Sequence, residues 1–336
     1  MEKKRIYFLK LFVLLLTLPL ILSACFKEDE KVPVHEAGDV LTKVIPLGEK
    51  YTSQFYYDLE SQDFVSTNSI FDWDLAFESS DTGWHIVMNG AKSMHAGNTY
   101  NKVFESITGD AGVKMHFDPS SGELDSSAIG LWYYTEGNET ISNGDVYVID
   151  RGLDLDFSSL GKKKISIDIQ NNDYLFRYAD LDGNNENTIT IRKDQDYNFI
   201  YFSFDEGIIE IAPKKDKWSM LFTKYATLLY TTTGEPYPYT VTGAILNRNK
   251  VRVAIDTLDF ESISLADTAN HVFTDRSDII GYDWKVYSLD EDKYVIVPDR
   301  NYIVRDKDAL YYKMRFIDFY DDLGVRGSIK LEVARL

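Results

Sequence analysis

Short runs in which apolar and polar residues alternate follow one another from Val40 to the end of the chain, separated by Gly, Asn and Asp. Alternation places successive side chains on opposite faces, as in a strand with one buried face. Roughly a dozen or more strands are expected. The clearest runs are Gln54–Leu59, Trp73–Phe77, Trp84–Met88, Val146–Ile149, Ile165–Ile169, Tyr197–Phe204, Tyr239–Leu246, Lys250–Ile255, Tyr294–Val297, Asn301–Val304, Leu310–Phe319 and Ile329–Val333. The pattern predicts an all-β, many-stranded antiparallel protein with very little helix.

Few segments have helical spacing. Ser262–Ala266 is long enough for one or two turns, and Lys217–Leu229 has some helical spacing but fits a buried strand better. Thr231–Pro238 is typical of a long hairpin loop. Phe71–Phe77 and Lys215–Phe222 each place a Trp ahead of an apolar strand. This likeness is compatible with two related β layers, but a single short pattern is weak evidence for a repeat.

Composition narrows the class of protein. The 336 residues are 44% apolar, enough for a folded core, and they carry a net charge of −18, which disfavours nucleic acid as a partner. With Cys25 as the single cysteine, one chain can form neither an internal disulfide nor a cysteine-based zinc site.

The N-terminus has the features of an export signal and an anchor. A basic start, Met1–Lys10, precedes the apolar run Leu11–Leu22, which is short for a membrane span. Leu22-Ser23-Ala24-Cys25 resembles a bacterial lipobox, whose cysteine receives diacylglycerol. We therefore expect residues 1–24 to be a lipoprotein signal peptide, Cys25 to be the lipidation site and residues 25–39 to be a flexible tether.

The charged residues behind the cysteine bear on location. Lys27 is followed by acidic residues, a pattern that resembles a surface-export signal of bacteria rich in surface lipoproteins. The sequence thus predicts a chain held at the outer membrane by its lipid, displayed at the cell surface, without a transmembrane helix.

The sequence lacks the common catalytic motifs. The chain has no G-x-S-x-G elbow, P-loop, Rossmann fingerprint or H-E-x-x-H motif, so we expect a binding protein. Asp180–Glu186 gathers oxygen ligands around a Gly, but it lacks the calcium-loop spacing, and a hairpin turn is the better interpretation.

Soft and imidazole side chains are the remaining candidates for metal chemistry. Met94 and His95 stand together in a Gly-bounded segment predicted to be a loop, and they could reach a cofactor. A surface histidine beside a packing methionine is the favoured interpretation, because nothing in the sequence fixes the relative geometry of the two side chains. His85 and Met88 fall on opposite faces of their strand, and Trp84, Ile86 and Met88 are expected in the core.

The C-terminal third carries a more specific pattern. It comprises Ile280–Lys285 with its Trp284, then Tyr294–Pro298, Asn301–Arg305, Tyr311–Tyr320 and Gly324–Gly327. Together with Trp73–Phe77 leading to Asn89-Gly90, this pattern resembles the HmuY family of haem-binding lipoproteins. The resemblance is loose over most of the mature chain and best over residues 239–336.

The resemblance implies an all-β protein on the outer membrane that takes haem, from solution or from haemoproteins, and passes it to a TonB-dependent receptor. Well-known family members hold the iron with two axial His, and relatives substitute Met. The matching positions here hold Tyr287-Ser288-Leu289 and Lys250-Val251-Arg252. Leucine cannot bind iron, so the ligand must come from elsewhere, and the candidates are His271, Tyr287, His95 and Met94.

The expected organisation is one HmuY-like β domain over residues 40–336, with a middle insertion at about residues 130–215. Trp132, Tyr133 and Tyr134 lie in that insertion and could stack on a porphyrin or a sugar ring, although core packing is the default for such residues. Two alternatives to haem capture remain open: an accessory or other-ligand-binding protein of the same fold, and a carbohydrate-binding or hydrolytic surface lipoprotein.

Overall fold

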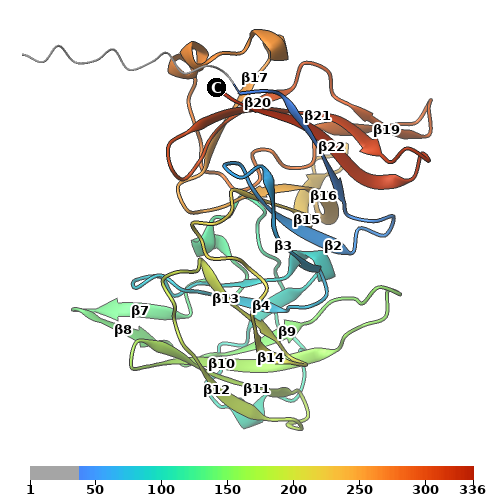
Figure 1. Cartoon of the computed structure of the whole chain (residues 1–336). Coiled ribbons are helices and arrows are strands. Elements are labelled where there is room, and N and C mark those ends of the chain that lie inside the picture. Colours follow the sequence, from blue (N-terminus) through green and yellow to red (C-terminus); the bar gives the residue numbers. More distant parts are fainter. Residues whose placement is uncertain (1–37) are drawn as a thin grey trace, which may run out of the picture. The chain divides into compact units, whose positions relative to one another are not determined.

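The computed structural model of this chain describes residues 38–336. The predicted signal peptide, Cys25 and nearly all of the predicted tether lie outside the described residues. Within them, four larger antiparallel sheets and two small hairpins fall into two groups of strands, which we call the central half and the terminal half (Figure 1).

The central half is one continuous stretch of chain, residues 71–209, whose strands run from residue 75 to residue 209. Its five-stranded sheet has the order β12 (Asn187–Ile191), β11 (Asp173–Asp180), β10 (Lys162–Gln170), β9 (Val146–Asp150) and β6 (His95–Asn98). Its four-stranded sheet has the order β14 (Gly207–Ile209), β13 (Phe199–Ser203), β4 (Leu75–Glu78) and β5 (Ile86–Met88). The hairpin β7 (Tyr133–Glu136) and β8 (Glu139–Ser142) and the short 3₁₀ helices η1 (Gly90–Lys92), η2 (Phe104–Ser106) and η3 (Leu124–Ser126) complete it.

The terminal half is built from both ends of the described chain. Its five-stranded sheet has the order β1 (Leu41–Pro46), β22 (Arg326–Arg335), β21 (Tyr311–Tyr320), β20 (Asn301–Arg305) and β17 (Arg252–Asp256). Its four-stranded sheet has the order β16 (Pro236–Leu246), β15 (Met220–Tyr230), β2 (Ser53–Asp58) and β3 (Asp63–Ser69). The hairpin β18 (Lys285–Ser288) and β19 (Lys293–Ile296) and the 3₁₀ helices η4 (Phe260–Ser262) and η5 (Leu265–Asn270) complete it.

The predicted all-β class is confirmed, and every predicted run overlaps a strand. Lys217–Leu229 forms most of β15, and the segment Ser262–Ala266 contributes to η4 and η5. Asp180–Glu186 is the turn between the paired strands β11 and β12. One local prediction was wrong: Met94-His95 is not a loop, because His95 begins β6 and Met94 is buried in the core of the central half.

The two halves repeat the same plan strand for strand, since each has a five-stranded sheet, a four-stranded sheet and one hairpin. The order along the chain matches when β1, β2 and β3, which correspond to β12, β13 and β14, are counted after β22. Side chains repeat as well. Asn89 follows β5 and donates from Nδ2 to the carbonyl oxygen of Trp73 at 2.8 Å. Asn247 follows β16 and donates in the same way to Trp218 at 2.7 Å. Phe71–Phe77 and Lys215–Phe222, the two similar segments, therefore occupy equivalent places.

A second pair of equivalent sites supports the repeat. The sequence Phe-Glu-Ser-Ile occurs at Phe104–Ile107 and again at Phe260–Ile263, and both copies form a 3₁₀ turn. A buried lysine donates to the last carbonyl of each copy: Lys164 at 2.9 Å in the central half and Lys313 at 3.2 Å in the terminal half. Both ammonium groups also lie about 5 Å from the phenylalanine ring of their copy.

The same two residue types, a glycine and then a tryptophan, precede or begin the hairpins β7–β8 and β18–β19. Gly130 and Gly281 adopt positive φ angles of 64° and 60°, which glycine allows at low cost. Each is soon followed by a tryptophan, Trp132 or Trp284, that is about 1% exposed and packs into the core of its own half. The repeat thus extends from sheet order to individual buried residues.

Each half encloses its own apolar core. The core of the central half joins residues 75–96 to residues 129–204. Phe77 of β4, for example, meets Tyr174 and Phe176 of β11 edge to face, with 5.1 Å between ring centroids in both cases. The segment predicted as an insertion is therefore packed against residues 75–96 in one core, and Trp132 belongs to that core.

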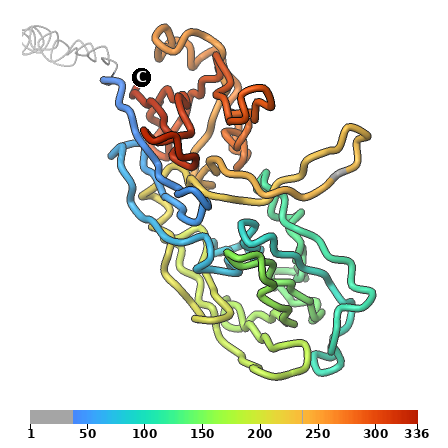
Figure 2. Tube along the Cα trace, turned by 90° about the vertical axis from the view of Figure 1, so that its right-hand side faces the viewer, coloured from blue at the N-terminus to red at the C-terminus, as the bar shows by residue number. Residues whose placement is uncertain are grey.

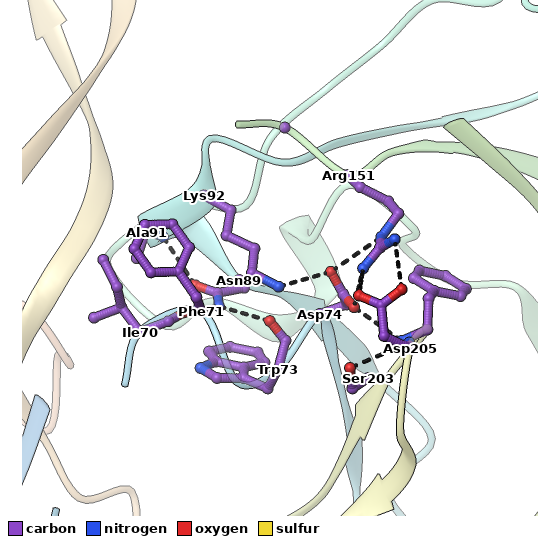
Figure 3. Close-up of polar contacts among 12 residues, drawn as sticks. Ile70, Phe71, Trp73, Asp74, Asn89, Ala91, Lys92, Arg151, Ser203 and Asp205 are labelled. Atoms are coloured by element: carbon purple, nitrogen blue, oxygen red, sulfur yellow. Dashed lines mark hydrogen bonds and ion pairs between the residues drawn. The ribbon is translucent and has the colours of Figure 1, made fainter. Parts of the chain in front are cut away.

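A buried ion cluster is placed where β4 begins (Figure 3). Asp74 is fully buried and pairs with Lys92 at 2.9 Å and with Arg151 at 3.1 Å. Its carboxylate also accepts the backbone N–H of Phe204 at 2.9 Å. Arg151 reaches on to the exposed Asp205 at 2.6 Å. Because buried charges are costly unless paired and hydrogen-bonded, this set of contacts holds η1, β9 and β13 together.

Candidate functional site

A cleft of about 500 Å³ lies between the outer part of the β15–β16 hairpin and the β18–β19 hairpin. Figure 2 shows the long β15–β16 hairpin as an extended arm. We call this space the tyrosine cleft, because its lining includes Tyr51, Tyr239, Tyr282, Tyr287 and Tyr294. Its volume is within the range of about 300–1,000 Å³ typical of small-molecule sites.

Tyr287 stands on β18 at the edge of the tyrosine cleft, and it is 44% exposed. Its hydroxyl donates to Oδ1 of Asp292 at 2.5 Å, and its ring meets Tyr294 edge to face at 5.2 Å. The hydrogen bond to Asp292 raises the pKa of Tyr287. Tyr287 also lines a neighbouring hollow of about 630 Å³.

Three cations also line the tyrosine cleft: Lys224, Lys285 and Arg326. Among residues 38–336, none of the three forms an ion pair with a carboxylate. Lys285 is 7% exposed, donates to the carbonyl oxygen of Thr242 at 2.7 Å and lies 4.2 Å from the Trp284 ring. Burial lowers the pKa of Lys285 to about 7 and also lowers the pKa of Lys224.

A cation without a counter-ion is notable in a chain of net charge −18. Arg326 lies over the Tyr51 ring at 5.8 Å from its centroid, which leaves its donors free of any carboxylate in the described part of the chain. An anionic group entering the tyrosine cleft would meet Lys224 and Arg326, whereas Asp283, which also lines the cleft, is paired with Arg300 at 2.6 Å. Aromatic rings and unpaired cations together suit a flat ligand that carries carboxylates.

The other candidate ligands lie away from the tyrosine cleft. His271 follows η5, where Nδ1 is 2.8 Å from the carbonyl oxygen of Asp267 and Nε2 is 3.1 Å from Oδ2 of Asp256. Met94 is 1% exposed within the central core, and His95 meets Phe117 edge to face at 6.2 Å. The structure therefore brings only Tyr287, of the four candidates, to the lining of the tyrosine cleft.

Sequence reasoning missed most of the tyrosine cleft. Tyr239 lies in a predicted strand, and Tyr282, Lys285 and Arg326 lie in segments that carry the family resemblance, but none of the four is among the predicted ligand-binding residues. The signal that pointed there was the tyrosine-rich sequence on both sides of the long hairpin loop, Pro236–Tyr239. The second family position, Lys250–Arg252, precedes or begins β17 and does not line the tyrosine cleft.

Two further observations concern metals and membranes. Within residues 38–336, no three His, Cys, Asp or Glu side chains are grouped closely enough to hold a metal ion. In the same part of the chain, no helix is long and apolar enough to cross a membrane.

The fold is all-β, and the tyrosine cleft is a candidate ligand site. The family model for the HmuY protein matches residues 50–332, and the chain therefore belongs to the HmuY family. No curated protein matches the sequence significantly.

Two solved structures are similar to this chain at low sequence identity. Apo PinO from Porphyromonas gingivitis is 11% identical, with 88% of this chain and 96% of that chain covered and a TM-score of 0.28. The apo HmuY analogue of Tannerella forsythia is 12% identical, with 90% and 98% covered and a TM-score of 0.26.

Proposed function

We propose that this protein is a non-enzymatic haem-binding lipoprotein that captures haem in the tyrosine cleft and passes it to a TonB-dependent receptor of the outer membrane. Membership of the HmuY family supports the class of function. The observation that carries the proposal is the convergence of tyrosines and three cations without carboxylate partners on one 500 Å³ cleft. Haem has a flat apolar ring and two carboxylates, and it matches both features.

Tyr287 is the side chain that we assign to the iron. Tyrosine is a known axial ligand of haem iron. In the free protein, Asp292 accepts the hydroxyl proton of Tyr287 in a hydrogen bond and disfavours the phenolate. Ferric iron supplies the opposite charge that stabilises the phenolate, so binding releases a proton and strengthens as the pH rises. Lys224 and Arg326 would then pair with the two carboxylates of haem.

The location belongs to the same proposal. Lipidation of Cys25 would attach the chain to the outer membrane, and display at the cell surface would place the tyrosine cleft where haem or haemoproteins are met. The first described residues lie beside the C-terminus, since the backbone N–H of Gly38 donates to the carbonyl oxygen of Arg335 at 2.8 Å. The predicted anchor is therefore connected to the terminal half, which also carries the tyrosine cleft.

A haemin titration of the chain beginning at residue 26 tests the proposal. We expect a saturable one-to-one shift of the Soret band and a visible phenolate-to-iron charge-transfer band. Tyr287→Phe keeps the ring and removes the ligand oxygen, so it should weaken binding by about tenfold or more and abolish the charge-transfer band. Tyr134→Phe, on the equivalent hairpin of the central half, is the matched control and should behave like the wild type.

The same titration separates the alternatives. A saturable shift that survives Tyr287→Phe but disappears in His271→Ala would transfer the ligand role to His271. Absence of any saturable shift would refute haem capture and leave a family member that carries another cargo. A carbohydrate ligand would then be sought by titration with oligosaccharides.

A further inference from the structure

A second, smaller cavity lies where the two halves of the described chain meet. Its volume is about 200 Å³, and its lining includes Trp73 and Tyr201 from the central half and Trp218 from the terminal half. Trp73 meets Tyr201 edge to face at 5.0 Å, and Trp218 meets Tyr56 in the same way at 5.0 Å. An apolar cavity of roughly 150 Å³ accepts benzene, so this junction cavity has room for a ligand with one ring.

A buried hydrogen-bond donor without a partner belongs to a residue that lines the junction cavity. The indole N–H of Trp73 is buried without a hydrogen-bond partner among residues 38–336. A buried polar group without a partner costs about 1–3 kcal/mol, and native proteins contain few of them. The indole N–H of Trp73 is therefore a donor that an acceptor group of a ligand could satisfy.

Lys224 adds a positive charge. It lines the junction cavity from β15, and in the described part of the chain its ammonium group has neither an ion pair nor a hydrogen-bond acceptor. Burial lowers the pKa of Lys224, which an approaching carboxylate would reverse. Asp118 also lines the cavity, but its oxygens accept the backbone N–H groups of Met88 at 2.5 Å and Ala128 at 2.8 Å.

We propose that the junction cavity binds a small monocarboxylate with an aromatic or branched apolar body. The apolar body would pack among the two Trp–Tyr pairs, the carboxylate would pair with Lys224, and the indole N–H of Trp73 would supply a further hydrogen bond. This proposal does not rest on haem capture, because it concerns a different cavity. Lys224 borders both cavities, so a carboxylate bound in one would compete for its ammonium group with a carboxylate bound in the other. The residues that carry it come from both halves, so the ligand would bridge them.

Calorimetric titration of the full chain with phenylacetate, and with phenylacetamide as its neutral match, tests the charge requirement. We expect saturable one-to-one binding of phenylacetate with a change in tryptophan fluorescence, and binding of the amide about tenfold weaker or worse. Lys224→Met should reduce phenylacetate binding to the level of the amide. Lys217→Met, an exposed lysine nearby in sequence, should leave it unchanged. Equal binding of the two probes, or no binding, would overturn the proposal.

A second pair of variants fixes the location, because Lys224 also borders the tyrosine cleft. Val87→Phe fills the junction cavity from the central half and should abolish phenylacetate binding in a protein that circular dichroism shows to be folded. Tyr287→Phe should leave phenylacetate binding intact. Binding that survives in folded Val87→Phe, or that is lost in Tyr287→Phe, would place the probe elsewhere and refute the junction site.

Discussion

The central and terminal halves share sheet order, hairpin position and buried motifs, yet the tyrosine cleft occurs in the terminal half. The difference lies in one hairpin. β4 and β5 have four and three residues, whereas their counterparts β15 and β16 have eleven each. The additional length carries Leu229 and Tyr239 to the lining of the cleft beside β18 and β19. A repeated scaffold thus acquires a ligand site by extension of one hairpin, while the core beneath it is preserved.

A second difference concerns the position just before the equivalent strands β4 and β15. The central half has Asp74 there, in a buried ion cluster, and the terminal half has Ser219, whose hydroxyl accepts the backbone N–H of Leu59 at 3.1 Å. Asp74→Ala leaves Lys92 and Arg151 without their shared carboxylate. We expect it to lower the free energy of unfolding by about 3–5 kcal/mol, against about 1 kcal/mol for Ser219→Ala.

Urea denaturation followed by circular dichroism measures both values. Equal losses for the two variants would contradict the view that the central half depends on buried charge at this position. Asp205→Ala is a useful third variant, because that carboxylate is largely exposed and its removal should cost little.

Shortening the long hairpin makes the terminal half resemble the central half. Replacement of residues 228–238 by Asn-Gly, together with Tyr239→Thr, joins the paired positions 227 and 239 through a tight turn. We expect haemin affinity to fall about 100-fold, because one wall of the tyrosine cleft is removed. Replacing only Thr231–Glu235 by Asn-Gly keeps that wall and should retain binding. If both deletions bind haemin equally well, the extension is not what creates the site.

The cations of the tyrosine cleft offer a finer comparison. Arg326→Gln removes a charge that meets no carboxylate in the described residues, so folding stability should change little. The affinity for haemin should fall about tenfold, since a charge-assisted hydrogen bond contributes about 1.5–3 kcal/mol. Haemin dimethyl ester, which lacks the carboxylates, should bind wild type and variant alike. Discrimination between them by the ester would contradict the assigned pairing.

The smallest expected effect concerns pH and the central half. His85 contacts Glu78 Oε2 at 2.6 Å and Asp125 Oδ1 at 2.7 Å, and the hydrogen bond to Glu78 is the main cause that raises the pKa of His85. The equivalent position of the terminal half is Gly243. The charged pair stabilises the folded state fully below the unfolded histidine pKa of about 6.5, and this contribution is lost as the pH rises through the folded value.

The lower limit of the pH range in which the His85–Glu78 pair is stabilising is set by Glu78. The hydrogen bond from His85 lowers the pKa of Glu78 against the opposing effect of burial, so this contribution is lost as the pH falls through the folded value. We expect the His85–Glu78 pair to change the free energy of unfolding by less than about 1 kcal/mol between pH 4 and pH 8. This part of the pH dependence should be absent in His85→Gln. If the free energy of unfolding depends on pH in the same way in His85→Gln and in the wild type, the pair does not contribute to the stability of this half.

Alternation along the sequence was sufficient to predict the fold class, because period-two burial is a local property. The pairing of strands is not local. The sequence contains Phe-Glu-Ser-Ile at Phe104–Ile107 and again at Phe260–Ile263, which would have revealed the repeat. Tyr287 could be selected from the family resemblance, but its neighbours Tyr239 and Arg326 arrive from strands far away in sequence. The prediction of a loop at Met94 is wrong because a short Gly-bounded segment shows no periodicity. Without periodicity, a loop cannot be distinguished from a buried residue that precedes a strand.

The order of strands in the terminal half has a consequence for how the molecule is made. β1, β2 and β3 belong to the first 69 residues, but β1 pairs with β22 and β2 pairs with β15. During synthesis, β2 and β3 can pair with each other at once, and β15 can join β2 as soon as residues 220–230 have been made. β1, by contrast, has no partner strand until β22, the last strand of the chain, has been made. All strands of the central half lie between these two in sequence, so that half is fully synthesised before β1 can be paired.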